Sequence, residues 1–221
     1  MEVSDTTLNV LKNFATINPS LLFPAGDKLA TLSPKKNIMA KAKIEESIPK
    51  RFAIYDLNQF LGVVSLFKKP EFDIGDQHVT IKNGNGHSSN YFFADESMID
   101  TPPDKEFDID PVVDVEIQDE EMKSVIQAAR VMSLPHVTIE SRGDKVLFKA
   151  CSIQDAGSNT YELNVGQATG NFRFIFSVEN LRFIPGKYNL QISKEGVAHF
   201  TLNGGSVEYF VATEHESAYN G

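Results

Sequence analysis

The sequence predicts an α+β protein in which a helix-and-sheet unit is repeated along the chain. Four short amphipathic segments recur at intervals of roughly 50 to 60 residues, and segments with the alternating pattern of strands separate them. A stretch at residues 95–111 holds three of the ten prolines and many acids, and it divides the chain nearly in half. We therefore expect an N-terminal domain at 1–94, a connector at 95–111 and a C-terminal domain at 112–221.

Two helices are expected in the N-terminal half. The first covers residues 4–17, with good N-cap residues at its start and a proline just past its end. Asp56 is placed to cap the second helix. The apolar positions of this second helix follow helical spacing and are Leu57, Phe60, Leu61 and Val64. Lys68 and Lys69 are expected at its C-terminal end, where cations suit the helix dipole.

A hairpin is expected at residues 72–93, with its turn at 83–86. Its returning strand carries consecutive aromatic residues, Tyr91, Phe92 and Phe93. Consecutive residues of a strand point to opposite faces of a sheet. Two interpretations remain open: both faces pack inside one chain, or one face is covered by another subunit.

The C-terminal half begins with a third helix at about 118–132, which carries Lys123 and Arg130 on a polar stripe. A fourth, short helix is expected at 178–183, with Arg182 on it. The remainder is predicted to be strands, followed by a frayed tail from residue 214. The expected strands are 137–141, 145–151, 161–165, 171–177, 188–193, 197–202 and 207–213.

Composition limits the possible functions. The chain has 221 residues, a net charge of −9 and a sequence pI near 5.0, which counts against an ordinary groove-binding DNA protein. A DNA-binding ring that confines its positive residues to an inner surface is not excluded, because the net charge of a protein does not show where on its surface those residues lie. Cys151 is the only cysteine, so no disulfide within the chain is possible. Without a signal peptide or a membrane-length apolar run, we expect a soluble intracellular protein.

No pattern in the sequence indicates catalysis. The five histidines have no metal-binding spacing, and no nucleophile elbow or phosphate-binding loop is present. Acid pairs such as Asp114 and Glu116 have the ligands for a divalent ion, but a solvated acidic connector explains them as well. Cys151 lies in an expected strand and is interpreted as core. We expect neither an enzyme, nor a metal site, nor a cofactor.

Two strings near the N-terminus, DTTLNVLKNFATIN and AIYDLNQFLGVVSL, closely resemble the DNA polymerase sliding clamps of T-even-type bacteriophages. The second half is similar more loosely, around MKSVIQAARVM and FRFIFSVENLRFIPGKYNLQI. The resemblance implies a homotrimeric ring of two-domain subunits, with helices lining a central pore and antiparallel sheets outside. It also implies a processivity factor that encircles double-stranded DNA, tethers the phage DNA polymerase and is loaded by an ATP-driven clamp loader. A role with late transcription factors, in the cytoplasm of the infected bacterial host, is further implied.

The resemblance places Lys12 and Arg130 in matching motifs that would face DNA. Lys123 and Arg182 are assigned to the pore from helix geometry alone, and Lys68 and Lys69 from their expected place at a helix end. The alternative is that surface helices commonly carry such residues. Asp5 is a departure, since it stands near a position where family members tend to carry lysine, so a less basic inner surface is expected.

Ring closure would require edge strands of neighbouring subunits to pair head to tail. The candidates are Tyr91, Phe92 and Phe93 on one strand, and Tyr161 and Leu163 on another. Partner proteins are expected to dock short apolar peptides beside the connector, near Phe107, Ile109 and Val112. The alternative function is a non-catalytic phage interaction or structural protein that has the fold but does not encircle DNA.

Overall fold

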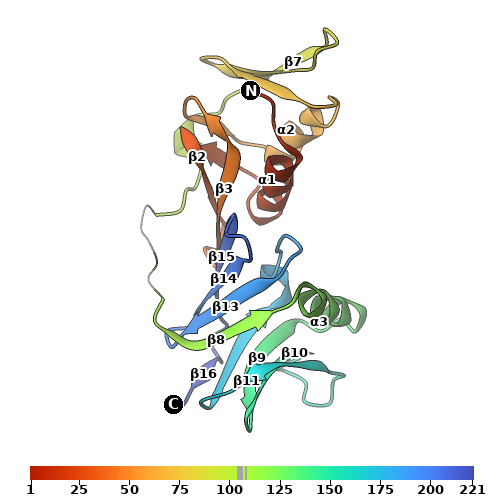
Figure 1. Ribbon diagram of the computed structural model, residues 1–221, viewed down its shortest axis with the longest axis vertical. Helices are drawn as coiled ribbons and strands as arrows, with labels where there is room; N and C mark the ends of the chain where they lie inside the picture. Colours follow the sequence, from red (N-terminus) through yellow and green to blue (C-terminus); the bar gives the residue numbers. More distant parts are fainter. Residues whose placement is uncertain (104–106, 108) are drawn as a thin grey trace. The chain divides into compact units, whose positions relative to one another are not determined.

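The computed structural model describes residues 1–103, 107 and 109–221, and the chain divides into two units, Met1–Asp104 and Lys105–Gly221 (Figure 1). Within the described residues there are three α-helices, two 3₁₀ turns and sixteen strands. The strands within each unit pair antiparallel. The expectation of an α+β fold is therefore confirmed.

The first unit is built around helix α1, Asp5–Ile17, which packs against the hairpin of β2, Gly26–Leu32, and β3, Ile38–Ile48. Ser4 is the N-cap, and its hydroxyl accepts from the Thr7 N–H at 3.2 Å. The face of α1 toward the sheet is buried. Its buried apolar residues are Val10, Leu11, Phe14 and Ile17.

The rest of the first unit surrounds helix α2, Leu57–Val64, whose N-cap is Asp56 as expected. Phe60 of α2 lies in an aromatic core with Phe23, Phe72 and Tyr91. The remaining elements are β1 (Leu21–Phe23), β4 (Phe52–Ile54), β5 (Glu71–Ile74), β6 (His78–Lys82), β7 (Ser88–Phe92) and the 3₁₀ turn η1 (Glu96–Met98). Strands β5, β6 and β7 form one sheet in that order, so β7 is at its edge.

The second unit has two sets of paired strands and one long helix, α3, Asp119–Val131. Strands β15, β14, β13 and β8 pair in that order, and β11, β10, β9, β12 and β16 form a second sheet with β11 at its edge. Helix α3 packs against β9, β10 and β11 (Figure 1). The bounds are β8 Pro111–Ile117, β9 His136–Arg142, β10 Lys145–Cys151, β11 Tyr161–Gln167, β12 Phe172–Ser177, β13 Tyr188–Ser193, β14 Val197–Leu202, β15 Val207–Ala212 and β16 Ala218–Tyr219.

The prediction of a fourth helix at 178–183 is wrong. Residues Val178–Asn180 form a single 3₁₀ turn, η2, and the following residues leave the helical path. Phe183 packs on Tyr188, Phe200 and Tyr209, while the Tyr188 hydroxyl donates to the Ile184 carbonyl at 2.6 Å. A helix this short gains too few internal hydrogen bonds to compete with those contacts, and the proline after Ile184 disfavours helical geometry there.

The tail after residue 214 is more ordered than expected. Strand β16 pairs with β12, with Phe172 opposite Tyr219. The Ser217 hydroxyl also accepts from the Ile175 N–H at 2.9 Å. Paired backbone groups hold this segment on the sheet, so the prediction of a frayed end is wrong for these residues.

Candidate nucleic-acid interface and docking surfaces

Helix α1 carries one cation, Lys12, on its exposed face. Asn9 and Thr16, three residues before and four after, are also exposed, so the three form one stripe. The opposite face is buried against the β2–β3 hairpin. Lys12 therefore lies on a polar helix surface that a sheet supports.

The start of α1 is fixed by Glu46 of β3. One carboxylate oxygen accepts from the Ser4 N–H at 2.5 Å, and the other accepts from the Thr7 hydroxyl. Burial acts to raise the pKa of Glu46, but the hydrogen bonds from Thr7 and Ser4 outweigh it and hold the pKa below its ordinary value. Sequence reasoning missed Glu46, because 42 residues separate it from Ser4 and no local pattern connects them.

Helix α3 carries Lys123 and Arg130 on its exposed side. The Lys123 ammonium bonds Asp119 at 2.5 Å and lies 3.8 Å from Glu120, so its charge is largely balanced within the helix. The hydrogen bond to Asp119 is also the main reason that the pKa of Lys123 is raised. Within the described residues, neither Arg130 nor Lys12 lies at salt-bridge distance from a carboxylate. These two are the helical cations best placed to meet a phosphate.

The other three cations predicted for the pore do not lie on helices. Arg182 follows the η2 turn, and its Nε donates to the Glu179 carbonyl at 2.8 Å. Lys68 and Lys69 lie beyond Val64, the last residue of α2, and Lys69 has a left-handed φ of 53°. The helical placement of all three is corrected, and their contact with DNA stays a prediction.

The aromatic cluster on β7 divides between the two faces of its sheet. The Tyr91 hydroxyl donates to the Gln59 side chain at 2.9 Å, and Phe93 stacks on Phe52 with ring centroids 4.9 Å apart. Phe92 points the other way and is 66% exposed. Among the three predicted interface aromatics, Phe92 is thus the one that leaves a large apolar surface uncovered.

Strand β11, at the edge of the other sheet, carries the second set of predicted interface residues. Its predicted interface residues, Tyr161 and Leu163, are half-buried and lie on the same side of the strand. The N–H and C=O groups along one side of an edge strand lack a partner within their own sheet. The geometry therefore leaves β7 and β11 available for strand pairing.

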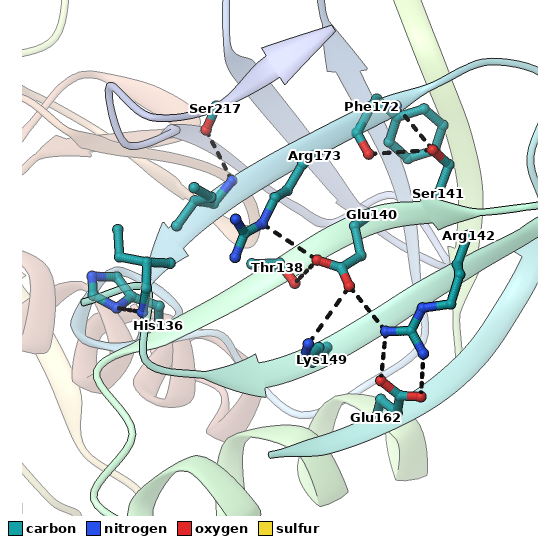
Figure 2. Close-up of polar contacts among 12 residues, drawn as sticks. His136, Thr138, Glu140, Ser141, Arg142, Lys149, Glu162, Phe172, Arg173 and Ser217 are labelled. Atoms are coloured by element: carbon teal, nitrogen blue, oxygen red, sulfur yellow. Dashed lines mark hydrogen bonds and ion pairs between the residues drawn. The ribbon is translucent and has the colours of Figure 1, made fainter. Parts of the chain in front are cut away.

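A charged cluster around Glu140 ties β11 to the rest of its sheet (Figure 2). The Glu140 carboxylate lies 3.3 Å from Arg142, 3.7 Å from Lys149 and 3.4 Å from Arg173, on strands β9, β10 and β12. Arg142 also forms a two-pronged pair with Glu162 of β11, at 2.8 and 3.0 Å. One carboxylate with a 13% exposed side chain thus connects cations from three strands, and Arg142 extends the network to the edge.

The predicted peptide-docking residues do not form one site. Phe107 is 42% exposed and contacts Phe210 with ring centroids 5.3 Å apart; Phe210 in turn stacks on His199 at 4.2 Å. Val112 instead lines a shallow hollow of about 250 Å³ with Val146 and Phe172. Ile109 is half-buried and belongs to neither group. Peptide docking at these positions stays a prediction.

The thiol of Cys151, the chain's single cysteine, is not exposed for nucleophilic chemistry. Cys151 is buried, and burial raises the pKa of its thiol, so a reactive thiolate is disfavoured. No three His, Cys, Asp or Glu residues of the described chain are grouped as a metal site. Nor does any helix in the described ranges have the length and apolarity required to cross a bilayer.

Comparisons with known proteins match both halves of the chain. A family model described as "DNA polymerase processivity factor" matches residues 4–99, and one described as "gp45 sliding clamp, C terminal" matches residues 114–215. The sliding clamp of Vibrio phage KVP40 is 29% identical, covering 97% of this chain and 99% of its own length. The sliding clamp of Enterobacteria phage T4 is 28% identical over the whole of both chains.

Solved structures show the same fold at lower identity. A PCNA of A. fulgidus, in a structure with the C-terminal region of FEN-1 bound, has a TM-score of 0.70 at 19% identity and covers 95% of both chains. A PCNA2–PCNA3 complex of Sulfolobus tokodaii has a TM-score of 0.72 at 15% identity and covers 98% of both. The chain therefore has the fold of a sliding clamp.

Proposed function

This chain belongs to the sliding clamps of T4-type phages, the family of DNA polymerase processivity factors, and from that premise we propose that it encircles duplex DNA and tethers the phage replicative polymerase. The observation that carries the proposal is the presence, in each unit, of a sheet-supported helix with an exposed cation. These cations are Lys12 on α1 and Arg130 on α3.

The small number of helical cations suits sliding better than static binding. Helix α1 carries one acid, Asp5, and one cation, Lys12. Helix α3 carries three acids in its first turn and two cations, Lys123 and Arg130. Phosphate contacts by a few lysines and arginines are independent of sequence and weaken steeply with salt. A closed ring does not need a tight contact, because its topology keeps it on the DNA.

Tethering would act through effective concentration. A polymerase bound to a clamp that surrounds its template rebinds in an intramolecular step after each release. No bond chemistry is required of the clamp, and we propose that this chain has no catalytic activity. The burial of Cys151, which disfavours a reactive thiolate, supports that view.

We propose that the ring is a homotrimer closed head to tail by β7 of one copy and β11 of the next. Both are edge strands, and β7 exposes Phe92. Pairing would give the unpaired backbone groups partners and cover this aromatic side chain. An ATP-driven clamp loader would open the ring, late transcription factors would share its docking surfaces, and the protein would act in the cytoplasm of the infected bacterium.

The test is charge reversal of both helical cations. Lys12→Glu with Arg130→Glu places like charges opposite the phosphates, so we expect the product length per polymerase binding event to fall at least about 10-fold in primer extension on circular template. The matched control, Lys145→Glu with Lys194→Glu, reverses two exposed lysines of the second unit and should leave product length unchanged.

Equal product lengths for the two variants would show that α1 and α3 do not face DNA. Light scattering should give a mass near three times 24.5 kDa for the unmodified protein. A trimer with no effect of the reversal on processivity would favour the alternative, a clamp-fold interaction protein that does not encircle DNA.

A further inference from the structure

A lysine-rich stretch lies in the β2–β3 hairpin, where Asp27, Glu45 and Glu46 flank it. Residues 28–43 contain five lysines and no acid, whereas the other 16 basic residues share the rest of the chain with all 30 acids. The five are Lys28, Lys35, Lys36, Lys41 and Lys43, and together they are called the lysine hairpin below. In a protein of net charge −9, such a segment is the strongest local departure from the overall charge.

The register of β2 and β3 places three of these lysines on one face. In the ladder of β2 and β3, Lys28 lies directly opposite Lys43, and Lys41 lies opposite Ala30, next to them. Because side chains alternate along a strand, the other face is formed by buried residues such as Ala42, toward α1. Lys35 and Lys36 are exposed in the turn that joins the strands.

This arrangement is unfavourable for the isolated chain. Like charges directly opposite each other across a ladder destabilise it, and Lys28 with Lys43 is such a pair. Asp27 compensates in part, with a carboxylate oxygen 3.4 Å from the Lys43 ammonium, where both side chains remain largely exposed. An anionic partner would relieve the remaining repulsion.

We propose that the lysine hairpin binds a short acidic segment of a partner protein. The three in-register lysines lie on the face away from α1. This step rests on the proposed function: with α1 facing the encircled DNA, these lysines point away from the DNA. From Lys28 to the end of β2 the ladder is about 13 Å long, which four to six extended residues would span.

Charge on the rest of the chain favours a peptide over duplex DNA. A duplex is charged along its whole length and would extend past the hairpin to the acidic remainder of the molecule, where it is repelled. A short acidic segment meets the five lysines against two neighbouring acids, Asp27 and Glu45, since screening removes interactions beyond about 8 to 10 Å at physiological salt. Lysine ammonium groups are compact and well hydrated, which suits a salt-sensitive contact without fixed geometry.

The test uses a fluorescein-labelled octaglutamate peptide and the full-length protein, with anisotropy measured at low and high salt. The hairpin variant is Lys28→Gln, Lys35→Gln and Lys36→Asn; asparagine is chosen for the last because Lys36 has a left-handed φ of 57°. The matched control is Lys145→Gln, Lys187→Gln and Lys194→Gln, which changes the net charge by the same amount. A labelled duplex of about 20 base pairs, longer than the hairpin, is the second probe.

We expect the hairpin variant to bind octaglutamate about 10-fold more weakly at low salt, the control to change less than about 2-fold, and the difference to vanish at high salt. Equal losses in both variants, or no binding by the unmodified protein, would overturn the proposal. So would a hairpin variant that loses duplex binding and keeps peptide binding, because that result assigns the lysines to nucleic acid. Lys12→Glu with Arg130→Glu should leave octaglutamate binding intact, which separates this proposal from DNA encirclement.

Discussion

At the residue scale, Glu46 shows how one distant side chain completes a local motif. The sequence predicts the start of α1, because Ser4 is a good N-cap residue and is the one used. The partner that fixes Ser4 and Thr7 comes from β3, and its contribution depends on a register that no local pattern encodes. Local sequence thus identifies the cap but not the residue that holds it against the sheet.

Replacing Glu46 with glutamine should destabilise the protein by about 1 kcal/mol at neutral pH, because the amide has a single, uncharged acceptor oxygen and cannot accept from both the Ser4 N–H and the Thr7 hydroxyl. The pKa of Glu46 is lowered in the folded state from an ordinary value of 4.5. Its stabilising effect is therefore complete above that value and is lost as the pH falls through the lower, folded pKa. Urea unfolding of both proteins from pH 7 to pH 3 should show the difference shrinking below about pH 4.5.

Glu45→Gln is the control for Glu46, since the neighbouring side chain is exposed and does not contact the helix cap. A Glu46→Gln difference that stayed constant down to pH 3 would mean that the carboxylate charge does not stabilise α1.

At the element scale, periodicity predicted most strands and failed where tertiary contacts compete. Three strands begin and end at the predicted residues: Lys145–Cys151, Tyr188–Ser193 and Val197–Leu202. The fourth helix failed because a buried pair, Tyr188 and Tyr209, binds the backbone of Ile184. Burial raises the pKa of Tyr209 to about 12, so this hydroxyl stays protonated and keeps its place in that network at neutral pH.

The edge of β7 gives a prediction about assembly. Phe92→Glu would place a charge in the proposed contact with β11, so the trimer should dissociate at protein concentrations where the unmodified protein remains assembled. Light scattering across a dilution series measures this. Met98→Glu changes another exposed apolar residue of the first unit and serves as the control. If Phe92→Glu kept the mass of the unmodified protein at every dilution, this edge would not be the interface.

The Glu140 cluster gives a prediction about the second sheet. Glu140→Gln leaves the cations of Arg142, Lys149 and Arg173 close together without their shared anion, so the free energy of unfolding should fall by about 2 kcal/mol. The urea midpoint reports this change. Glu195→Gln, at an exposed turn, should shift the midpoint little, and a comparable shift in both variants would show that the cluster does not stabilise the sheet.

At the scale of the whole molecule, the α+β class and the family could both be recognised from sequence. The sequence did not show which elements, and which of their faces, carry the positive charges. The helices were expected to carry the cations, yet Arg182 lies after a 3₁₀ turn and Lys123 is paired within α3. The lysine-rich segment at 28–43 is visible in the sequence, but which face of which sheet it occupies depends on the pairing of β2 with β3.

Topological binding predicts an unusual dependence on salt. After loading by the phage clamp loader, the protein should remain on nicked circular DNA through gel filtration at about 0.5 M salt, where phosphate contacts are largely screened. Cutting the same circle should release it, because the ring can then slide off an end. Release from circular and linear DNA at the same rate would mean that charge, rather than encirclement, holds the protein.

The single buried thiol makes this chain convenient for fluorescence work. Cys151 is 3% exposed and its pKa is raised, so maleimide reagents at neutral pH should react with it slowly. A cysteine introduced on the exposed side of β7 and another on β11 would therefore be labelled selectively without removing the native residue. Energy transfer between two such dyes could then follow the opening and closing of an individual subunit junction in real time.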